Sequence, residues 1–200
     1  AQAVPPVKPD FKKHMPGMLA LPGHKGLHGP QGTGLLIFRK DLKLQPLLMG
    51  GTGTASDSTY QPLEPPEALE AGTLFSGGIA ALHAGAKWSF EHRERNGAVI
   101  KRLAEELIDY LKGLGAELYT DDPTLGVVSF NLRGKESSFV ANALAEKDIA
   151  VRGGLHCAPL AHTALGTLSR GAVRASIGAD NTEKDIYLFV AALEKLCVAK

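Results

Sequence analysis

The chain is poor in cysteine and in aromatic side chains, and it contains no long apolar run. Only two of its 200 residues are cysteine, Cys157 and Cys197, so neither a disulfide framework nor a cysteine-rich zinc site is expected. No apolar stretch approaches the roughly 20 residues that a membrane-spanning helix needs. The 22 basic and 21 acidic residues are interspersed, which gives no indication of a nucleic-acid or membrane partner. We therefore expect a cytoplasmic protein.

A glycine-rich stretch at 22–34 separates two short apolar runs, 18–21 and 35–38. Runs of this length bounded by glycines predict strands rather than helices, and we expect both strands to be buried. Residues 41–48 predict a further short strand and turn. The Pro- and Glu-rich residues 61–75 predict a long irregular connection, which in a compact domain is usually functional or disordered.

The second half of the sequence alternates helical and strand patterns. Apolar residues at three- and four-residue spacing predict a helix from Gly77 to Gly113, interrupted at Asn96-Gly97, as one broken helix or as two in series. The other elements that we expect are strands at 116–120, 126–132, 149–152 and 172–177, a helix at 138–146 capped by Ser137 or Ser138, and a last helix from Asn181 or Thr182. The pattern predicts an α/β fold that ends in a small domain.

Lys25 is the first candidate for chemistry, because it lies in the glycine-rich stretch, within Pro22-Gly23-His24-Lys25-Gly26. The commonest alternative is a solvated loop lysine. Buried strands on both sides would instead desolvate the amine and make it a usable nucleophile, such as a Schiff-base lysine. The glycines could let backbone amides approach a phosphate, although their spacing matches neither the dinucleotide nor the Walker A motif. Composition alone leaves both interpretations open.

Cys157 is the second candidate. It lies in Arg152-Gly153-Gly154-Leu155-His156-Cys157-Ala158-Pro159, a loop-like segment that places it beside His156 and five residues after Arg152. A free cysteine is usually a small buried hydrophobe, and we interpret Cys197 in this way. Cationic neighbours would instead raise the thiolate fraction of Cys157 and make it a nucleophile.

Arg174 interrupts an otherwise apolar strand. Its charge is expected either to pair with a structural carboxylate or to bind the carboxylate of a substrate through two parallel hydrogen bonds. Thr73, which follows Gly72, could contact a phosphate, and a plain turn is an equal alternative. No metal site is predicted, because metal-ligand spacing is absent from the remaining histidines: His14, His28, His83, His92 and His162.

Taken together, these motifs resemble those of the cysteine desulfurase and selenocysteine lyase family, class V aminotransferase-like enzymes that use pyridoxal phosphate on the fold-type-I scaffold. Residues 22–34 match the Gly-His-Lys motif and its glycine-rich turn, and residues 152–157 match the Arg-x-Gly-x-His-Cys signature of the short-loop members. The resemblance implies the C-terminal half of such an enzyme. Residues 1–93 would end the large mixed-sheet cofactor domain, whose upstream part would be missing, and residues 94–200 would form the small α/β domain.

The resemblance also implies how the cofactor is held. Lys25 would hold pyridoxal phosphate covalently and later move the proton of the substrate, while His24 would help to hold the phosphate. Gln2 would contact the phenolic oxygen of the cofactor. Thr73 would reach the phosphate in the site of the neighbouring subunit, which implies a homodimer.

L-cysteine is the substrate that the resemblance implies. Arg174 would bind its carboxylate, and Arg152 is expected to be a second substrate-binding residue. Cys157 would attack the sulfur of the substrate, keep it as a persulfide and release L-alanine. The sulfur would then supply iron–sulfur clusters or other thio-cofactors, through a possible acceptor protein. The complete protein would be the enzyme, and this chain alone is expected to bind the cofactor poorly and to be inactive.

Other functions remain open on the sequence. A selenocysteine lyase or a related pyridoxal-phosphate β-lyase would use the same Lys25, Arg174 and Cys157. An aminotransferase would need no thiol on a loop. A non-catalytic scaffold or assembly partner with the same fold would be expected to lose Lys25 or Cys157, and the chain has both.

Overall fold

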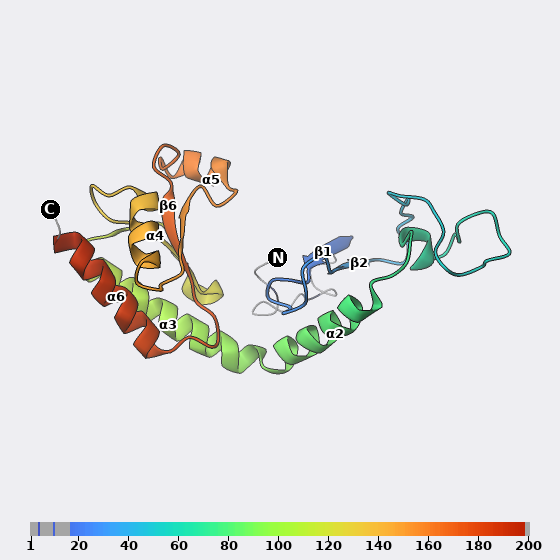
Figure 1. The fold of residues 1–200 in the computed structure, drawn as a ribbon, viewed down its shortest axis with the longest axis horizontal. Helices are drawn as coiled ribbons and strands as arrows, with labels where there is room; N and C mark the ends of the chain where they lie inside the picture. The colour runs from blue at the N-terminus through green and yellow to red at the C-terminus, as the bar shows by residue number, and fades with distance from the viewer. Residues whose placement is uncertain (1–3, 5–9, 11–16, 199–200) are drawn as a thin grey trace. The chain divides into compact units, whose positions relative to one another are not determined.

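The structure is a computed structural model that describes residues 4, 10 and 17–198, and its chain divides into two compact units (Figure 1). Unit 1 extends to His92, and unit 2 begins at Arg93. Each unit has a hydrophobic cluster of its own. Among the described segments, no helix is both long enough and apolar enough to cross a membrane.

Unit 1 is organised around an antiparallel pair of strands, β1 (Met18–Pro22) and β2 (Gly34–Phe38). Both strands were predicted, and the glycine-rich stretch connects them. The predicted burial is wrong, because most side chains of the pair are exposed and Leu21 is its buried residue. The physical reason is that the described chain provides an apolar cover for one face of the pair only.

That cover is α2 (Ser76–Glu91), which follows the pair after a long irregular connection. Leu82 of α2 is buried in one cluster with Leu21 of β1 and Leu27 of the glycine-rich connection. The connection before α2 contains one short 3-10 helix, η1 (Glu67–Leu69). The cluster fixes the glycine-rich connection against α2.

The strand predicted at 41–48 is wrong, since this segment has no regular structure. Pro46 cannot donate a backbone hydrogen bond, and proline within a run argues against a strand. Leu47 and Leu48 are exposed, so the leucine pattern does not reflect a buried face.

Two helices in series, α2 and α3 (Arg93–Gly113), occupy the region where a broken helix or two helices were predicted. The break lies at His92, not at the predicted Asn96-Gly97. Gly97 is accommodated inside α3, because a glycine within a helix costs only about 1 kcal/mol. At the end of α2, the backbone N–H of His92 donates to the carbonyl oxygen of Trp88 at 3.1 Å, and the His92 ring Nδ1 lies 2.9 Å from the same oxygen.

Unit 2 contains a four-stranded antiparallel sheet in the order β3 (Glu117–Leu118), β4 (Val127–Asn131), β6 (Ala172–Ser176), β5 (Arg152–Gly154). The strand predicted at 149–152 is shifted, because pairing with β6 starts at Arg152 and continues to Gly154. In this region, the backbone of β5 approaches α4 closely, and a Cβ added to the glycine at 153 would meet a backbone oxygen of α4 at 2.6 Å.

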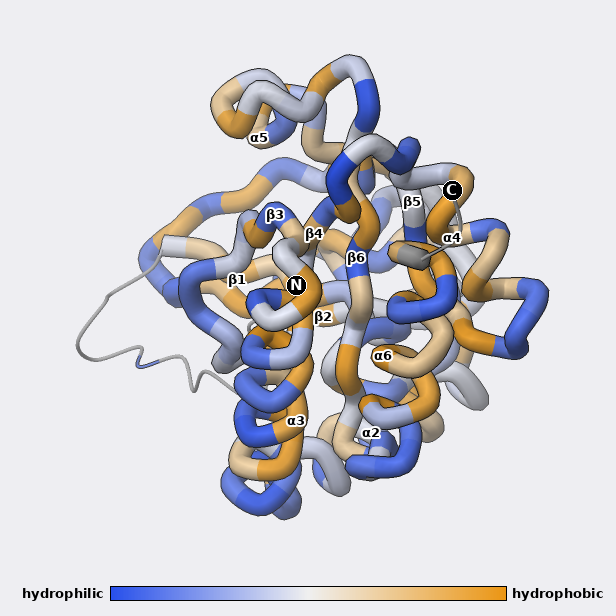
Figure 2. Tube along the Cα trace, turned by 90° about the vertical axis from the view of Figure 1, so that its left-hand side faces the viewer, coloured by the Kyte–Doolittle hydropathy of each residue, from blue (hydrophilic) through white to orange (hydrophobic). Residues whose placement is uncertain are grey.

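Three helices cover one face of this sheet: α3, α4 (Ser137–Ala145) and α6 (Glu183–Val198). α3 carries its apolar residues along one side (Figure 2). Val128 and Phe130 of β4 and Val173 of β6 are fully buried against these helices. The alternate residues of the same strands lie on the opposite face, because neighbouring side chains of a strand point to opposite sides.

The predicted serine cap of α4 is wrong. The cap residue is Glu136, whose side chain makes no capping hydrogen bond. The buried hydroxyl of Ser137 instead donates to the carbonyl oxygen of Arg170 at 2.6 Å. A tertiary contact has therefore replaced the local one that the sequence pattern favours.

Candidate functional site

Lys25 lies in the connection between β1 and β2, with its side chain exposed. Backbone hydrogen bonds shape this connection: Gly23 N to Thr33 O, Gly29 N to Gly23 O, and His28 N to Lys25 O, at 2.8, 2.8 and 3.0 Å. Within the described residues, the Lys25 amine makes neither a hydrogen bond nor an ion pair. The predicted desolvated cleft is therefore wrong for this chain, because no described element covers the amine.

The Lys25 connection packs directly against α2. The backbone carbonyls of Leu27 and His28 lie so close to α2 that a Cβ on Gly85 would approach each oxygen to 2.6 Å. His28 has a φ of 52°, its Nδ1 lies 2.7 Å from the hydroxyl of the buried Ser89, and its ring meets Trp88 edge to face. The absence of a side chain at Gly85 therefore lets the connection approach α2 closely, and the hydroxyl of Ser89 binds the His28 ring.

This arrangement predicts that Gly85→Ala displaces the Lys25 connection. The added methyl group would overlap two backbone carbonyls, and such overpacking costs about 1–3 kcal/mol. We expect a lower melting temperature, measured by calorimetry. Gly77→Ala is the matched control, since nothing lies within 4 Å of its added Cβ in the same helix. Equal behaviour of the two variants would contradict the described contact.

The other predicted cofactor residues of unit 1 are His24 and Thr73, and both are exposed. Thr73 follows Gly72, which has a φ of 93° and donates its N–H to the carbonyl oxygen of Gly51 at 2.7 Å. Within the described residues, Thr73 makes no hydrogen bond to the Lys25 connection. Gln2 lies outside the described residues.

Cys157 lies shortly after the end of β5, and it is exposed. Its φ is 59° and that of the preceding His156 is 52°. Positive φ is uncommon for residues with a Cβ, costs about 1–3 kcal/mol and is concentrated at functional sites. The Nη2 atom of Arg152 donates a hydrogen bond to the sulfur of Cys157 at 3.7 Å. The exposed sulfur is therefore in contact with a positive charge.

Arg174 lies in the same row of the sheet as Arg152 and Ser129. It is the register partner of Arg152 in β5 and of Ser129 in β4, so the three residues share the face opposite the core. Like charges that face each other across a sheet are destabilising. Neither arginine forms an ion pair with a described carboxylate, and the Nε of Arg174 is buried without a hydrogen-bond partner. The row therefore provides a positive site suited to an anion.

His156 is anchored to β6 through its ring. Its Nε2 lies 2.9 Å from the carbonyl oxygen of Ala172, so Nε2 carries the proton and Nδ1 is left buried without a partner. Burial lowers the pKa of His156, the carbonyl of Ala172 opposes this, and the charges of Arg174, His162 and Arg152 lower the pKa further. His156 is therefore neutral at neutral pH.

The lowered pKa of His156 predicts acid sensitivity of unit 2. The unfolded chain takes up this proton at about pH 6.5, and the folded chain only at lower pH, so stability rises with pH in this window. The contribution is present above about pH 6.5 and is lost as the pH falls through the pKa of the folded state. We expect His156→Gln to flatten the pH dependence of the unfolding midpoint, because glutamine can still donate to Ala172. A steeper dependence would contradict this assignment.

Comparison with known proteins identifies the family. The family model of the class-V aminotransferases matches residues 1–189, and the chain belongs to this family. The chain is 38% identical to a probable cysteine desulfurase of Pyrococcus abyssi and 36% identical to one of Methanothermobacter thermautotrophicus. Each alignment covers 98% of this chain, with 50% and 51% of the respective relative. The chain therefore spans about half the length of these curated relatives.

Solved structures of cysteine desulfurases have the same fold. The apo enzyme from Thermococcus onnurineus is similar with a TM-score of 0.84 and 34% identity, over 94% of this chain and 48% of that one. The Escherichia coli enzyme CsdA gives a TM-score of 0.79 and 29% identity, over 93% and 47%. The predicted family and the predicted α/β fold of the fold-type-I enzymes are confirmed. The individual residue roles stay predictions.

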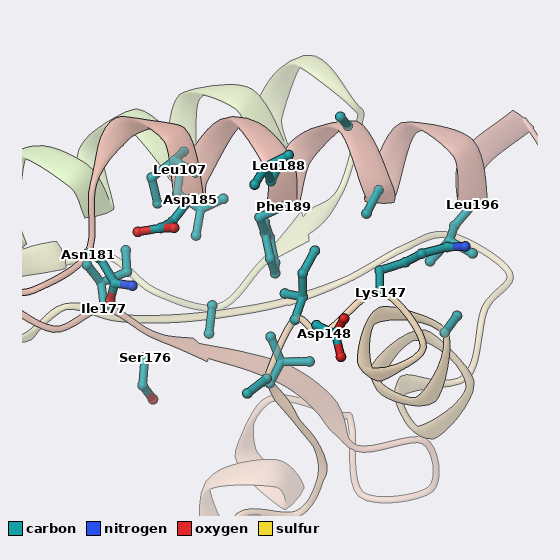
Figure 3. Close-up of a pocket in the computed structure, with 18 of the residues that line it drawn as sticks. Leu107, Lys147, Asp148, Ser176, Ile177, Asn181, Asp185, Leu188, Phe189 and Leu196 are labelled. Carbon is teal, nitrogen blue, oxygen red and sulfur yellow. The ribbon is translucent and has the colours of Figure 1, made fainter.

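A separate groove lies between α6 and the segment at 147–151 (Figure 3). Its volume is about 760 Å³, and apolar side chains such as Ile186 and Phe189 line much of it. Lys147 and Asp148 add charge to its lining. None of the described candidate site residues lines this groove, so the candidate chemistry lies elsewhere.

Sequence reasoning did not find several residues that support the candidate site. Gly85 and Ser89 hold the Lys25 connection, and Arg170, in the loop that carries Cys157, forms an ion pair with Glu117 of β3. The short helix α5 (Pro159–Ala164) after Cys157 was also not predicted. Pro159 at the start of α5 was the available signal, since proline is favoured at the first helical position.

Proposed function

We propose that the complete protein is a pyridoxal-phosphate-dependent cysteine desulfurase, which converts L-cysteine to L-alanine and keeps the sulfur as a persulfide on Cys157. The observation that carries this proposal is the contact between the exposed Cys157 sulfur and the Arg152 guanidinium at 3.7 Å. Transamination needs no such thiol. Membership in the class-V family supports the proposal.

The residues of unit 1 fit the cofactor on which this family depends. Lys25 offers an exposed amine on a glycine-rich connection, without a hydrogen-bond or ion-pair partner in the described chain. Lys25 would hold pyridoxal phosphate covalently, and His24 and Gln2 would add contacts. Thr73 would reach the cofactor of a neighbouring subunit in a homodimer. When bound, the cofactor supplies an electron sink for the carbon atoms of the substrate.

Arg174 would bind the carboxylate of the substrate. Its buried Nε has no partner in the described chain, and a buried unsatisfied donor costs about 1–3 kcal/mol. A carboxylate oxygen would remove this cost and form a charge-assisted hydrogen bond. The remaining guanidinium nitrogens can donate to the second oxygen, which fixes the orientation of the amino acid.

Cys157 would then take the sulfur. Its sulfur, which the Arg152 guanidinium contacts, forms as the thiolate a sulfur–sulfur bond with the substrate while the carbon–sulfur bond breaks. The electron pair of the broken bond remains with the carbon skeleton, which takes up a proton and leaves as L-alanine. The Lys25 amine would carry protons to and from the substrate carbon atoms. We propose that an acceptor protein or a reductant then removes the persulfide sulfur.

Product analysis tests this function. The complete protein, loaded with pyridoxal phosphate, is incubated with L-cysteine and a thiol reductant, and L-alanine and sulfide are quantified. The proposal predicts equal amounts of both products and no keto acid. Formation of a keto acid from L-cysteine would contradict it and would favour another reaction of the class-V family.

A further inference from the structure

The two ends of the loop that carries Cys157 lie next to each other at the sheet. It joins the end of β5 to the start of β6 and contains α5 (Figure 1). Gly171 at its far end packs directly on Gly154 at its near end, where an added Cβ would come within 2.6 Å of the Gly154 Cα. A displacement of one end therefore moves the other.

The far end is held through its backbone carbonyls. Ser137 of α4 donates to the carbonyl oxygen of Arg170 at 2.6 Å, and the buried Asn131 of β4 donates to that of Gly171 at 2.8 Å. The next carbonyl, that of Ala172, receives the His156 ring at 2.9 Å. Three successive carbonyls thus hold the far end of the loop, and the last of them binds the residue next to Cys157.

The side chain of Arg170 reaches the opposite edge of the sheet. Its guanidinium forms an ion pair with Glu117 of β3 and donates to the hydroxyl of Tyr119 at 2.9 Å. The Tyr119 hydroxyl in turn donates to Glu117 at 2.8 Å. The hydrogen bonds from Arg170 and Tyr119 lower the pKa of the Glu117 carboxyl. The carboxyl therefore stays ionised at neutral pH and keeps its contacts with both side chains.

Hydrogen bonds between buried residues fix the interior of the loop. The buried His162 and Thr167 are joined side chain to side chain at 2.7 Å, and Thr167 N–H donates to the His162 carbonyl at 2.8 Å. Gly171 N–H donates to the Thr167 carbonyl at 2.7 Å. Because the interior of the loop is fixed, its position depends on how its ends are attached.

We propose that Arg170, held by Glu117 and Tyr119, is a positioning residue that keeps the Cys157 sulfur in contact with the Arg152 guanidinium. The connection runs from Arg170 through the Ala172 carbonyl and the His156 ring to Cys157. The proposal rests on the proposed function for its effect on turnover, although not for its effect on the thiol. Arg170 itself touches neither the Cys157 sulfur nor Arg174 in the described chain.

Arg170→Gln in the complete, cofactor-loaded protein tests this proposal. Loss of the ion pair loosens the attachment, and misplacement by about 1 Å can cost on the order of 100-fold in rate. We expect kcat for L-cysteine to fall at least about tenfold, with KM changed less than about twofold because Arg174 keeps its place. Arg170→Lys retains the charge and is expected to restore part of kcat.

Alkylation of Cys157 by iodoacetamide is the second readout, and it needs no turnover. Loss of the contact with Arg152 changes the surroundings of the sulfur, so the profile of alkylation rate against pH should shift in Arg170→Gln. The modification is followed at the Cys157 peptide, because Cys197 is also exposed. Arg102→Gln is the matched control, since it breaks an exposed ion pair with Glu183 elsewhere in unit 2.

Tyr119→Phe removes one hydroxyl with little change in shape. It replaces Arg170→Gln as the test variant if Arg170→Gln does not fold. It should shift the alkylation profile in the same direction by a smaller amount. Profiles and kcat values equal to those of the Arg102→Gln control, in folded variants, would overturn the positioning role. A shifted profile in a protein that makes no L-alanine would support the positioning role and refute the proposed function.

Discussion

Lys25→Ala is expected to lower the rate of L-alanine formation from L-cysteine by on the order of 10⁴-fold, because it removes the proposed covalent anchor of the cofactor and the proposed proton carrier together. The variant should also lose the visible absorbance of covalently bound pyridoxal phosphate. Lys25 lies exposed in the β1–β2 connection, so the change should leave the melting temperature of the cofactor-free protein almost unchanged.

The control for this variant is Lys87→Ala. Lys87 is an exposed lysine of α2 in the same unit, paired with Glu91 at 3.9 Å, and exposed pairs of this kind contribute about 1 kcal/mol or less. It should retain cofactor binding and turnover. Borohydride reduction of the wild type, followed by peptide mapping, should place the cofactor on Lys25. A label on another lysine would refute the assignment.

Cys157→Ala is expected to abolish desulfuration of L-cysteine, with a loss on the order of 10³-fold or more, because the proposed acceptor of the sulfur is gone. Cofactor binding should remain, since the proposed anchor Lys25 is unchanged in this variant. Cys197→Ser provides the matched control. Cys197 lies in α6 and is exposed rather than buried as predicted, and it is expected to have no role.

Comparing L-cysteine with L-selenocysteine as substrates of Cys157→Ala distinguishes a cysteine desulfurase from a selenocysteine lyase. If Cys157→Ala loses activity on both L-cysteine and L-selenocysteine, the desulfurase interpretation is favoured. Survival of the selenium reaction alone would favour a selenocysteine lyase. Full activity on L-cysteine in Cys157→Ala would exclude Cys157 as the sulfur acceptor.

Local patterns predicted most strands and helices of this chain. Short apolar runs beside glycines identified β1 and β2, and the helical spacing identified α2 and α3. The alternation in the second half predicted β4, β6 and α6. These predictions succeed because periodicity is a property of neighbouring residues, which a sequence shows directly.

Several predictions that depend on long-range contacts failed. The exposure of Lys25 depends on what covers β1 and β2, and this cannot be read from the two strands. Ser137 bonds to Arg170, 33 residues away, instead of capping its own helix. The ion pair between Glu117 and Arg170 spans 53 residues and has no local signal.

The candidate site was predicted through motifs rather than through geometry. Lys25 and Cys157 were found because their flanking residues resemble a family. The register that sets Arg174 opposite Arg152, and the contact of Arg152 with the Cys157 sulfur, required the structure. Sequence reasoning named Arg152 both as a cationic neighbour of Cys157 and as a substrate-binding residue. Its guanidinium contacts the Cys157 sulfur, and its role toward the substrate stays a prediction.

The most direct test of the central claim is the mass of the Cys157 peptide after one turnover without reductant. The complete, cofactor-loaded protein is mixed with L-cysteine, excess thiol is blocked, and the proteolytic peptides are weighed. The persulfide account predicts that the Cys157 peptide gains one sulfur atom, that the Cys197 peptide does not, and that a reductant reverses the gain. Formation of L-alanine with an unchanged Cys157 peptide, or with the sulfur on Cys197, would contradict the account.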